Sequence, residues 1–347
     1  MKIALIADLH LGIKKQCPVF MESQLRFFRE QFVPELTEHG IKTIWVLGDV
    51  FDTRQQINTL VINKTIELFR DTLKDFDVRI LVGNHDMYLT TDTEINSLKI
   101  LDLLPNVTVY EKPTDVIIDN KKVLVLPWIT DYTTADQLIT KKYDYCFCHA
   151  DIIGFDQGGG RLSENGLKAK TLLDKIQRVY SGHYHNGVHR EYLNNQSITY
   201  LGAPYQLTRI DRDGIRGYHI LDFITGERTL IENKVSIKFT KHMYPNVNLD
   251  LVKGNVVDME VPYEFIDQSK KIADYVTKLE KLHPAYPVNI IHLQNEEEID
   301  ETEFNTDNLN IITLFKTYLD QLETPVNKDK LYESFNTLYN SYKEQSQ

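Results

Sequence analysis

Three stretches of the chain each join an apolar run to a polar turn: Ile3-Ala-Leu-Ile-Ala-Asp-Leu-His-Leu-Gly12, Thr43-Ile-Trp-Val-Leu-Gly-Asp-Val-Phe-Asp52 and Val78-Arg-Ile-Leu-Val-Gly-Asn-His-Asp86. Apolar runs of this kind are typical of strands that are covered by helices on both faces. The segments between them, Phe20–His39 and Asn58–Asp75, have helical periodicity. Strand–helix–strand alternation predicts a parallel-rich sheet flanked by helices.

Beyond Leu104 the chain becomes dense in short strands. We expect them at Val107–Tyr110, Val116–Ile118, Val123–Leu126, Tyr143–Cys148, Val179–Ser181, Ile198–Leu201 and Gly217–Asp222. With the first three strands, they predict one large α/β domain that contains two layered sheets.

Polar side chains follow most of these strands. In chain order the signals are Asp8-x-His10, Gly48-Asp49-Val-Phe-Asp52, Gly83-Asn84-His85-Asp86, His149 and Gly182-His183-x-His185. Because the carboxyl ends of parallel strands open on one crevice, we expect these side chains to lie close together. Imidazole, carboxylate and amide donors suit divalent ions such as Mn²⁺, Fe²⁺ or Zn²⁺. The set is large enough for two ions with a bridging carboxylate.

Taken singly, each signal also has a structural explanation. An isolated Asp-x-His is usually a surface turn, and the glycine and asparagine of Gly83-Asn84 tolerate positive φ in turns. The occurrence of five such signals, most of them at strand ends, favours a metal site over a series of turns.

On these residues the chain resembles the calcineurin-like metallophosphoesterases, and within them the SbcD-type nuclease subunits of double-strand-break repair in their bacteriophage form. Ala7–Gly12, Gly48–Thr53 and Gly83–Asp86 carry the resemblance, and Tyr200-Leu-Gly-Ala-Pro204 is similar to the family's Gly-Ser/Thr-Pro segment. The resemblance implies an α/β fold: a layered two-sheet sandwich flanked by helices, a small α+β capping domain and C-terminal helices.

The resemblance also implies two divalent metal ions, with Mn²⁺ expected and Mg²⁺, Fe²⁺ or Zn²⁺ as alternatives. Residues expected to hold one ion are Asp8, His10, Asp49 and His185. Residues expected to hold the other are Asp49, Asn84, His149 and His183. The shared carboxylate of Asp49 would bridge the two ions.

His85 is expected to remain free of metal and to act as the general acid on the leaving oxygen. A histidine suits that task because its pKa lies near working pH. Asp52 lies where the family often places the carboxylate that orients this histidine, although some members have a histidine there. Asp86 is expected to brace the loop.

Composition excludes several classes of protein. The 347 residues are 42% hydrophobic and 26% charged, so the chain is neither disordered nor fibrous, and its length suggests about two domains. No apolar run approaches the ~18 residues of a membrane span. Three cysteines give no disulfide framework and indicate a reducing compartment, the host bacterial cytoplasm if a phage encodes the chain. The net charge of −11 argues only weakly against nucleic acid, because six of the acids lie between Glu296 and Glu303.

Several basic side chains lie close in sequence to the predicted ligands. The candidates for contact with DNA phosphates are Arg54, Arg161, Lys168, Lys170, Arg209 and Arg212. A solvated surface position is the alternative for each. Cys146 and Cys148 are expected to be small buried groups on one face of a strand, not zinc ligands.

The chain divides into four expected segments. Residues 1–235 form the metallophosphoesterase domain, and residues 236–294 form the capping domain that positions DNA. Residues 295–308 are acidic and form a linker, and residues 309–347 form a helical segment that docks a partner. Its apolar residues at helical spacing are Ile312, Phe315, Leu319 and Leu322 before Pro325, and Leu331, Phe335 and Leu338 after it.

The function that the resemblance implies is that of a metal-dependent DNA nuclease, an exonuclease and endonuclease subunit of an SbcCD-type recombination and repair complex. Its partners would be DNA and an SbcC-type coiled-coil ATPase, with a homodimer inside a heterotetramer. Helices Phe20–His39 or Asn58–Asp75 would form the dimer. A small-molecule phosphodiesterase of the same fold and an inactive scaffold are the alternatives. The complete ligand set disfavours the scaffold, whereas the cap and tail disfavour the small-molecule enzyme.

Overall fold

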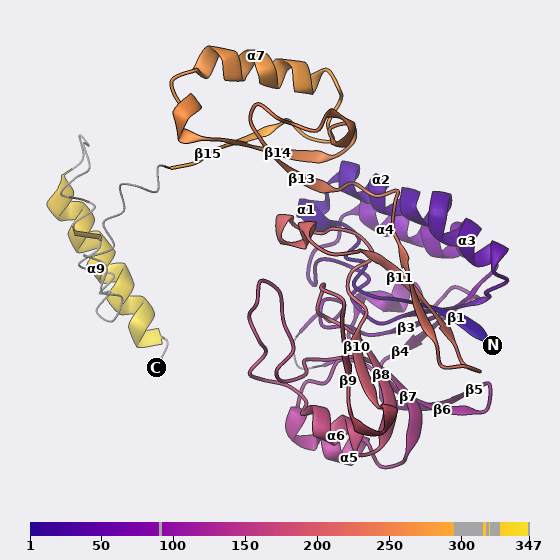
Figure 1. Ribbon diagram of the computed structural model, residues 1–347. Helices are drawn as coiled ribbons and strands as arrows, with labels where there is room; N and C mark the ends of the chain where they lie inside the picture. Colours follow the sequence, from indigo (N-terminus) through magenta and orange to yellow (C-terminus); the bar gives the residue numbers. More distant parts are fainter. Residues whose placement is uncertain (90–91, 295–314, 317–318, 320–326, 346–347) are drawn as a thin grey trace. The chain divides into compact units, whose positions relative to one another are not determined.

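The computed structural model describes residues 1–89, 92–294, 315–316, 319 and 327–345. The chain divides into two compact units, Met1–His292 and Leu293–Gln347. Figure 1 shows the arrangement of the helices and strands within each unit. Among the described residues, no helix is both long and apolar enough to cross a bilayer.

The first sheet has six strands. Their order is β12 (Arg228–Glu232), β11 (Gly217–Asp222), β1 (Lys2–Ile6), β2 (Thr43–Val46), β3 (Asp77–Leu81) and β4 (Val107–Tyr110). Strands β1 to β4 are parallel, whereas β11 runs antiparallel to both β1 and β12.

The second sheet also has six strands. Their order is β5 (Thr114–Ile118), β6 (Lys121–Leu126), β7 (Tyr143–His149), β8 (Ile176–Gly182), β10 (Ser197–Tyr200) and β9 (Val188–Glu191). The four central strands are parallel, and an antiparallel strand closes each edge.

The two sheets pack face to face over a shared apolar core that includes Leu5, Trp45, Phe147 and Tyr180. Helices cover the outer faces (Figure 1): α2 (Pro18–Phe27), α3 (Val33–Glu38) and α4 (Thr59–Glu67) on the first sheet, and α5 (Ala135–Leu138) and α6 (Ala169–Leu173) on the second. The predicted layered two-sheet sandwich is confirmed. Short helical turns are α1 (Ile13–Gln16), η3 (Ser97–Ile100), η4 (Tyr132–Thr134), η5 (Leu193–Asn195), η6 (Arg209–Arg212), η7 (Leu249–Leu251) and η8 (Tyr263–Phe265).

The helix expected at Phe20–His39 begins earlier, at Pro18, and contains a π-helical segment, η1 (Phe28–Phe32). Proline is favoured in the first turn of a helix, which explains the early start. Pro34 lies two residues after the last residue of the π-helical segment, Phe32. It has no N–H, and its ring would crowd the carbonyl of Glu30 in a regular helix, so the wider turn accommodates it. Helix α4 also continues into a π-helical segment, η2 (Leu68–Thr72).

Strands β9 and β12 did not emerge from the sequence pattern. Each lies at the edge of its sheet and is intermediate or exposed along its whole length. Edge strands of this kind contain few apolar residues, so the periodicity that identifies a half-buried strand is missing.

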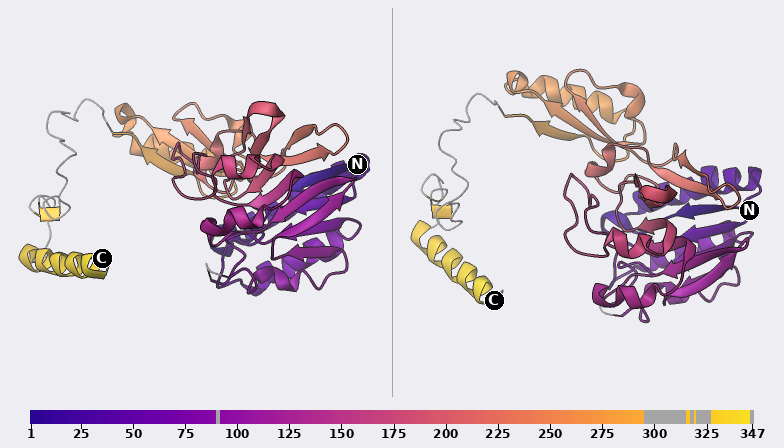
Figure 2. Two further views of the ribbon diagram at one scale, coloured as in Figure 1. Left: turned by 90° about the horizontal axis from the view of Figure 1, so that it is seen from below. Right: turned by 60° about the horizontal axis from the view of Figure 1, so that its bottom comes forward.

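A three-stranded parallel sheet follows, formed by β13 (Phe239–Met243), β14 (Val256–Val261) and β15 (Asn289–His292). Helix α7 (Ser269–Glu280) covers one face of this sheet (Figure 2) and buries Ile272 and Leu279 against it. We call residues 239–292 the cap. Helix α2 contacts the cap through Phe20, whose ring stacks on that of Phe239 at 5.8 Å between centroids.

In the second unit, α9 spans Lys328–Gln345. The ring of Phe315 stacks on that of Phe335 with 4.0 Å between centroids, and Leu319 is buried. Of the predicted apolar stripes, Ile312, Leu322 and the side chain of Leu338 lie outside the described residues.

Candidate metal centre

The predicted ligands lie at the carboxyl ends of strands from both sheets. Asp8 follows β1, Asp49 follows β2, and Asn84 follows β3, while His149 ends β7 and His183 follows β8. Backbone hydrogen bonds join the first two loops: the Asp8 amide donates to the Gly48 carbonyl at 3.2 Å, and the His10 amide donates to the Asp49 carbonyl at 3.0 Å.

The Asp49 carboxylate occupies the middle of the cluster. Its Oδ2 atom lies 3.6 Å from Nε2 of His10 and 3.4 Å from Nε2 of His149. Two groups of possible metal ligands share this residue, one with His10 and His85 and the other with His149 and His183. The Nε2 atoms of His10 and His185 lie 3.0 Å apart, which places His185 beside the first group.

In the second group, atoms that only accept hydrogen bonds when the imidazoles are neutral face one another. Nδ1 of His149 donates to the Leu47 carbonyl at 2.7 Å, and Nε2 of His183 donates to Asp151 at 2.8 Å. When these imidazoles are neutral, their other nitrogens carry no proton. Those nitrogens lie 3.0 and 2.9 Å from Oδ1 of Asn84. A cation between such atoms would satisfy all of them.

Asp8 provides a second sign that the residues fit a metal ion. Its Oδ1 atom accepts a hydrogen bond from the His183 amide at 2.8 Å, whereas its buried Oδ2 atom has no hydrogen-bond partner among the described residues. Leaving a buried carboxylate oxygen unsatisfied is costly. A divalent ion held by Asp8, His10, Asp49 and His185 would remove that cost.

The electrostatics of the cluster also favour a cation. Burial opposes ionisation of Asp49, but the neighbouring His149, His10 and His85 hold its pKa below the usual range. Burial also opposes charge on His149, yet Asp49 and Asp8 raise its pKa to about 10. The carboxylates therefore attract positive charge strongly, and metal binding at such a site displaces the proton.

The backbone is strained at four of the predicted ligands. Asp8, His10, Asp49 and His183 all have positive φ, between 40° and 95°. Conformations of this kind are unfavourable for residues with a side chain and cluster at functional sites. Gly48 and Gly83 permit the close approach of the loops: a Cβ atom at Gly48 would overlap His149, and one at Gly83 would overlap Asp49.

His85 lies beside the cluster, with its ring centroid 4.8 Å from that of His10. The structure differs from the prediction in how His85 is held. Nδ1 of His85 donates to the backbone carbonyl of Asp52 at 2.7 Å. The Asp52 carboxylate lies instead 3.3 Å from Nδ1 of His10. A main-chain oxygen can orient His85 whatever side chain stands at position 52, and the Asp52 side chain lies near His10 instead.

Asp86 braces the loops, as expected. Its buried carboxylate accepts hydrogen bonds from the backbone amides of Asp49, Val50, Phe51 and Gly83, at 2.9 to 3.2 Å. Burial and the charge of Asp49 raise the pKa of Asp86, and the backbone donors oppose that shift. These bonds tie the turn after β2 to the turn after β3.

Asp151 lies in the site although no motif in the sequence pointed to it. Its Oδ1 atom accepts hydrogen bonds from His183 at 2.8 Å and from the Tyr184 hydroxyl at 2.7 Å, and its Oδ2 atom accepts one from Tyr132 at 3.0 Å. The Trp128 ring packs on that of His183, with 4.9 Å between centroids. Asp151 follows His149 by two residues, and a carboxylate so close to a predicted ligand was the available signal.

The basic candidates divide into three groups. Arg54 lines a groove of about 690 Å³ together with His85 and Lys15. Arg209 and Arg212 hydrogen-bond to the buried carboxylate of Asp258 in the cap, at 2.6 to 3.0 Å. They also line a cavity of about 600 Å³ with Gly159 and Gly160.

The other three candidates show no contact with the histidine cluster in the described part of the chain. Arg161 is exposed in the loop that contains Gly158–Gly160. Lys168 precedes α6, and Lys170 in α6 forms an ion pair with Asp174 at 2.6 Å. Cys146 and Cys148 are both buried in β7, within the core under α5 and α6.

A two-layered sheet sandwich with histidines, carboxylates and an asparagine at its strand ends defines the class of the protein. The profile of the calcineurin-like phosphoesterases matches residues 1–187, and the chain belongs to that family. The predicted family is therefore confirmed.

The chain is also similar to two individual proteins. The chain is 26% identical to exonuclease subunit 1 of Enterobacteria phage T4 over 350 aligned residues, which cover 98% of each chain. It is also 24% identical over 198 residues to the putative phosphoesterase 078R of Invertebrate iridescent virus 3, with 53% of each chain covered.

Proposed function

We propose that this chain is the nuclease subunit of a two-component complex and hydrolyses phosphodiester bonds in DNA. The observation that carries the proposal is the position of Asp49, whose carboxylate is shared by two groups of possible ligands with His85 alongside. The similarity to exonuclease subunit 1 extends over nearly the whole chain, cap and tail included, and supports DNA as the substrate.

We assign one divalent ion to Asp8, His10, Asp49 and His185, and the other to Asp49, Asn84, His149 and His183, with Mn²⁺ as the proposed metal. Paired ions in such sites activate the attacking water and neutralise phosphoryl charge. The protein's own contribution is to hold these ligands in place through Asp86, Asp151 and Asp52. It also places His85 with Nδ1 donating to the Asp52 carbonyl, so that Nε2 of the doubly protonated ring would donate its proton to the leaving oxygen and leave a neutral imidazole.

The cap and the groove beside His85 support DNA as the class of substrate. Lys15 and Arg54 line this groove, and their charges would attract a DNA backbone. The other proposed contacts along the path of the DNA are Arg161, Arg209, Arg212, Lys168 and Lys170.

The proposed partner is an SbcC-type coiled-coil ATPase bound by the second unit, and the proposed assembly is a heterotetramer containing two copies of this chain. We propose the host bacterial cytoplasm as the place of action.

One assay separates this function from its alternatives. Linear duplex DNA, single-stranded DNA and bis-p-nitrophenyl phosphate are each incubated with the protein in Mn²⁺, Mg²⁺ or EDTA. A nuclease degrades DNA with Mn²⁺ and not with EDTA. Hydrolysis of the small ester without cleavage of either DNA would indicate a small-molecule phosphodiesterase, and no hydrolysis of any substrate would indicate a scaffold.

A further inference from the structure

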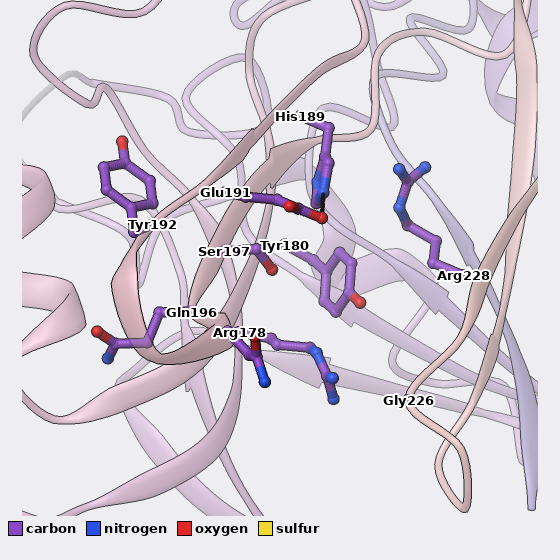
Figure 3. A pocket seen from close by; sticks show the side chains of 10 residues that line it. Arg178, Tyr180, His189, Glu191, Tyr192, Gln196, Ser197, Gly226 and Arg228 are labelled. Atoms are coloured by element: carbon purple, nitrogen blue, oxygen red, sulfur yellow. Dashed lines mark ion pairs between the residues drawn. The ribbon is translucent and has the colours of Figure 1, made fainter.

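A cavity of about 360 Å³ lies where strands β8, β9 and β10 of the second sheet face the turn between β11 and β12 (Figure 3). Arg178 stands near the start of β8, five residues before His183. At about 3.3 Å per residue, this puts its Cα atom roughly 16 Å along the strand from that of His183. The cavity is therefore separate from the candidate metal centre.

One of its two arginines, Arg228, is held by a neutral partner. Nη1 of Arg228 donates to Nδ1 of His219 at 2.8 Å, and Nε2 of His219 donates to the Leu201 carbonyl at 3.1 Å. Burial and the charge of Arg228 lower the pKa of His219 to about 4, so this imidazole is uncharged at neutral pH. His219 therefore fixes the guanidinium of Arg228 without neutralising it.

The other arginine, Arg178, lies against the backbone of Gly226. A Cβ atom at Gly226 would overlap the guanidinium, and the φ of this glycine is +72°. Nη1 of Arg178 is 3.5 Å from the Tyr145 hydroxyl, which is again a neutral group. In the described part of the chain, neither Arg178 nor Arg228 forms an ion pair with a carboxylate. Glu191, on the rim, is exposed and lies 3.6 Å from Nε2 of His189.

Two half-buried guanidinium groups without counter-ions are unfavourable unless an anion joins them. A guanidinium presents its N–H groups as a planar fork that matches phosphate oxygens. Figure 3 shows Arg178, Tyr180 and Arg228 at this cavity with Ser197, and the hydroxyls of Tyr180 and Ser197 are further hydrogen-bonding groups in the lining. The cavity volume falls in the range of small-molecule sites, and Tyr192 offers a ring at the rim.

We propose that this cavity binds the phosphate group of a small molecule, with a free mononucleotide as the class of ligand. The proposal rests on the uncompensated arginine pair and does not depend on the reaction at the metal centre.

The test measures binding to the Mn²⁺-loaded full chain by isothermal titration calorimetry. The probes are inorganic phosphate, deoxyadenosine monophosphate and a single-stranded oligonucleotide without terminal phosphates. The double variant Arg178→Gln/Arg228→Gln is expected to weaken binding of the first two probes at least about tenfold, because each arginine contributes charge-assisted hydrogen bonds. Arg70→Gln, an exposed arginine paired with Asp71, should bind as the wild type does.

Asp49→Asn distinguishes the cavity from the metal centre, since binding at the cavity survives that change. Loss of phosphate and nucleotide binding in Asp49→Asn, with normal binding in the arginine variant, would overturn the proposal. So would binding of the oligonucleotide alone, which would make the DNA backbone the source of the phosphate. If the double variant does not fold, Arg178→Lys replaces it in the test. This variant keeps the positive charge but loses the planar fork of guanidinium N–H groups. Weaker binding of inorganic phosphate and deoxyadenosine monophosphate, with an unchanged melting temperature, supports the site.

Discussion

The backbone amide of His85 donates a hydrogen bond to Oδ1 of Asp49 at 2.8 Å. The central carboxylate of the cluster and the proposed general acid are thus connected directly, although 36 residues separate them. Any change at Asp49 therefore acts on the ligands and on the position of His85 together. The two residues nevertheless have different proposed roles, and variants at each position can distinguish these roles by their effects on metal binding and on rate.

Asp49→Asn is expected to abolish hydrolysis and to reduce metal binding at both positions. An amide has one carbonyl oxygen and no charge, so it cannot bridge two cations as a carboxylate does. The measurement is Mn²⁺ stoichiometry together with the rate on bis-p-nitrophenyl phosphate. Asp71→Asn, at an exposed site, is the matched control. Two bound Mn²⁺ ions and a near-normal rate in Asp49→Asn would refute the shared-ligand assignment.

His85→Gln is expected to retain both ions while cleavage falls by about 10²–10⁴-fold, the range typical for loss of a general acid. His39→Gln, on the surface, should change neither quantity. The same pair of measurements decides the role of His85. If one equivalent of Mn²⁺ is lost along with the rate, His85 is a ligand, as its place in the group with His10 and Asp49 would permit.

The sequence predicted the parts of the site that lie within one strand and its following turn. Asp8 follows an apolar run directly and Asp49 follows one after a single glycine, and their neighbours in the sequence reveal both the strand and the change to polar residues. The contact of Asp258 with Arg209 joins residues 49 positions apart, and Asp52 reaches His10 through the packing of two loops. Such contacts depend on how elements are placed, which periodicity does not encode.

Asp151→Ala is expected to weaken Mn²⁺ affinity by about 10–100-fold, the usual effect of removing a carboxylate that orients a ligating histidine. His183 loses the acceptor for its Nε2 proton, so its ring and tautomer are no longer fixed. Tyr132→Phe removes a single donor to Asp151 and should have a smaller effect. The readout is a Mn²⁺ titration of activity. A rate that stays low at saturating Mn²⁺ would show that Asp151 does more than position His183.

Asp258→Asn is expected to lower stability by about 2 kcal/mol at pH 7, because the buried carboxylate receives charge-assisted hydrogen bonds from Arg209 and Arg212. Burial opposes ionisation of Asp258, but bonds from Arg209 and Asn289 and the charges of both arginines lower its pKa. A lowered folded pKa stabilises the protein above the unfolded value of about 4, and this stabilisation is lost as the pH falls through the folded pKa.

Thermal unfolding measured at several pH values tests whether the stabilisation by Asp258 is lost on acidification. The difference in melting temperature between wild type and Asp258→Asn should be constant near neutral pH and should shrink below about pH 4. A difference that grows on acidification would contradict the ion pair as its source. Asp144→Asn, which changes an exposed carboxylate paired with Lys121, should show a much smaller difference at every pH.

Deletion of residues 305–347 is expected to leave bis-p-nitrophenyl phosphate hydrolysis intact and to abolish both co-purification with the ATPase partner and ATP-stimulated DNA degradation. The proposed catalytic residues all lie in the first compact unit, which ends at His292. In the second unit, Phe315 and Phe335 stack on each other, so its apolar residues make contacts of their own. An amphipathic helix of this kind can lie in a partner's groove or against a coiled coil.

Phe335→Ala is a milder variant that removes the stacking of the two rings. It should weaken the complex with the ATPase partner and leave hydrolysis of bis-p-nitrophenyl phosphate unchanged. If the truncated chain forms the complex with normal affinity, the second unit does not bind the partner.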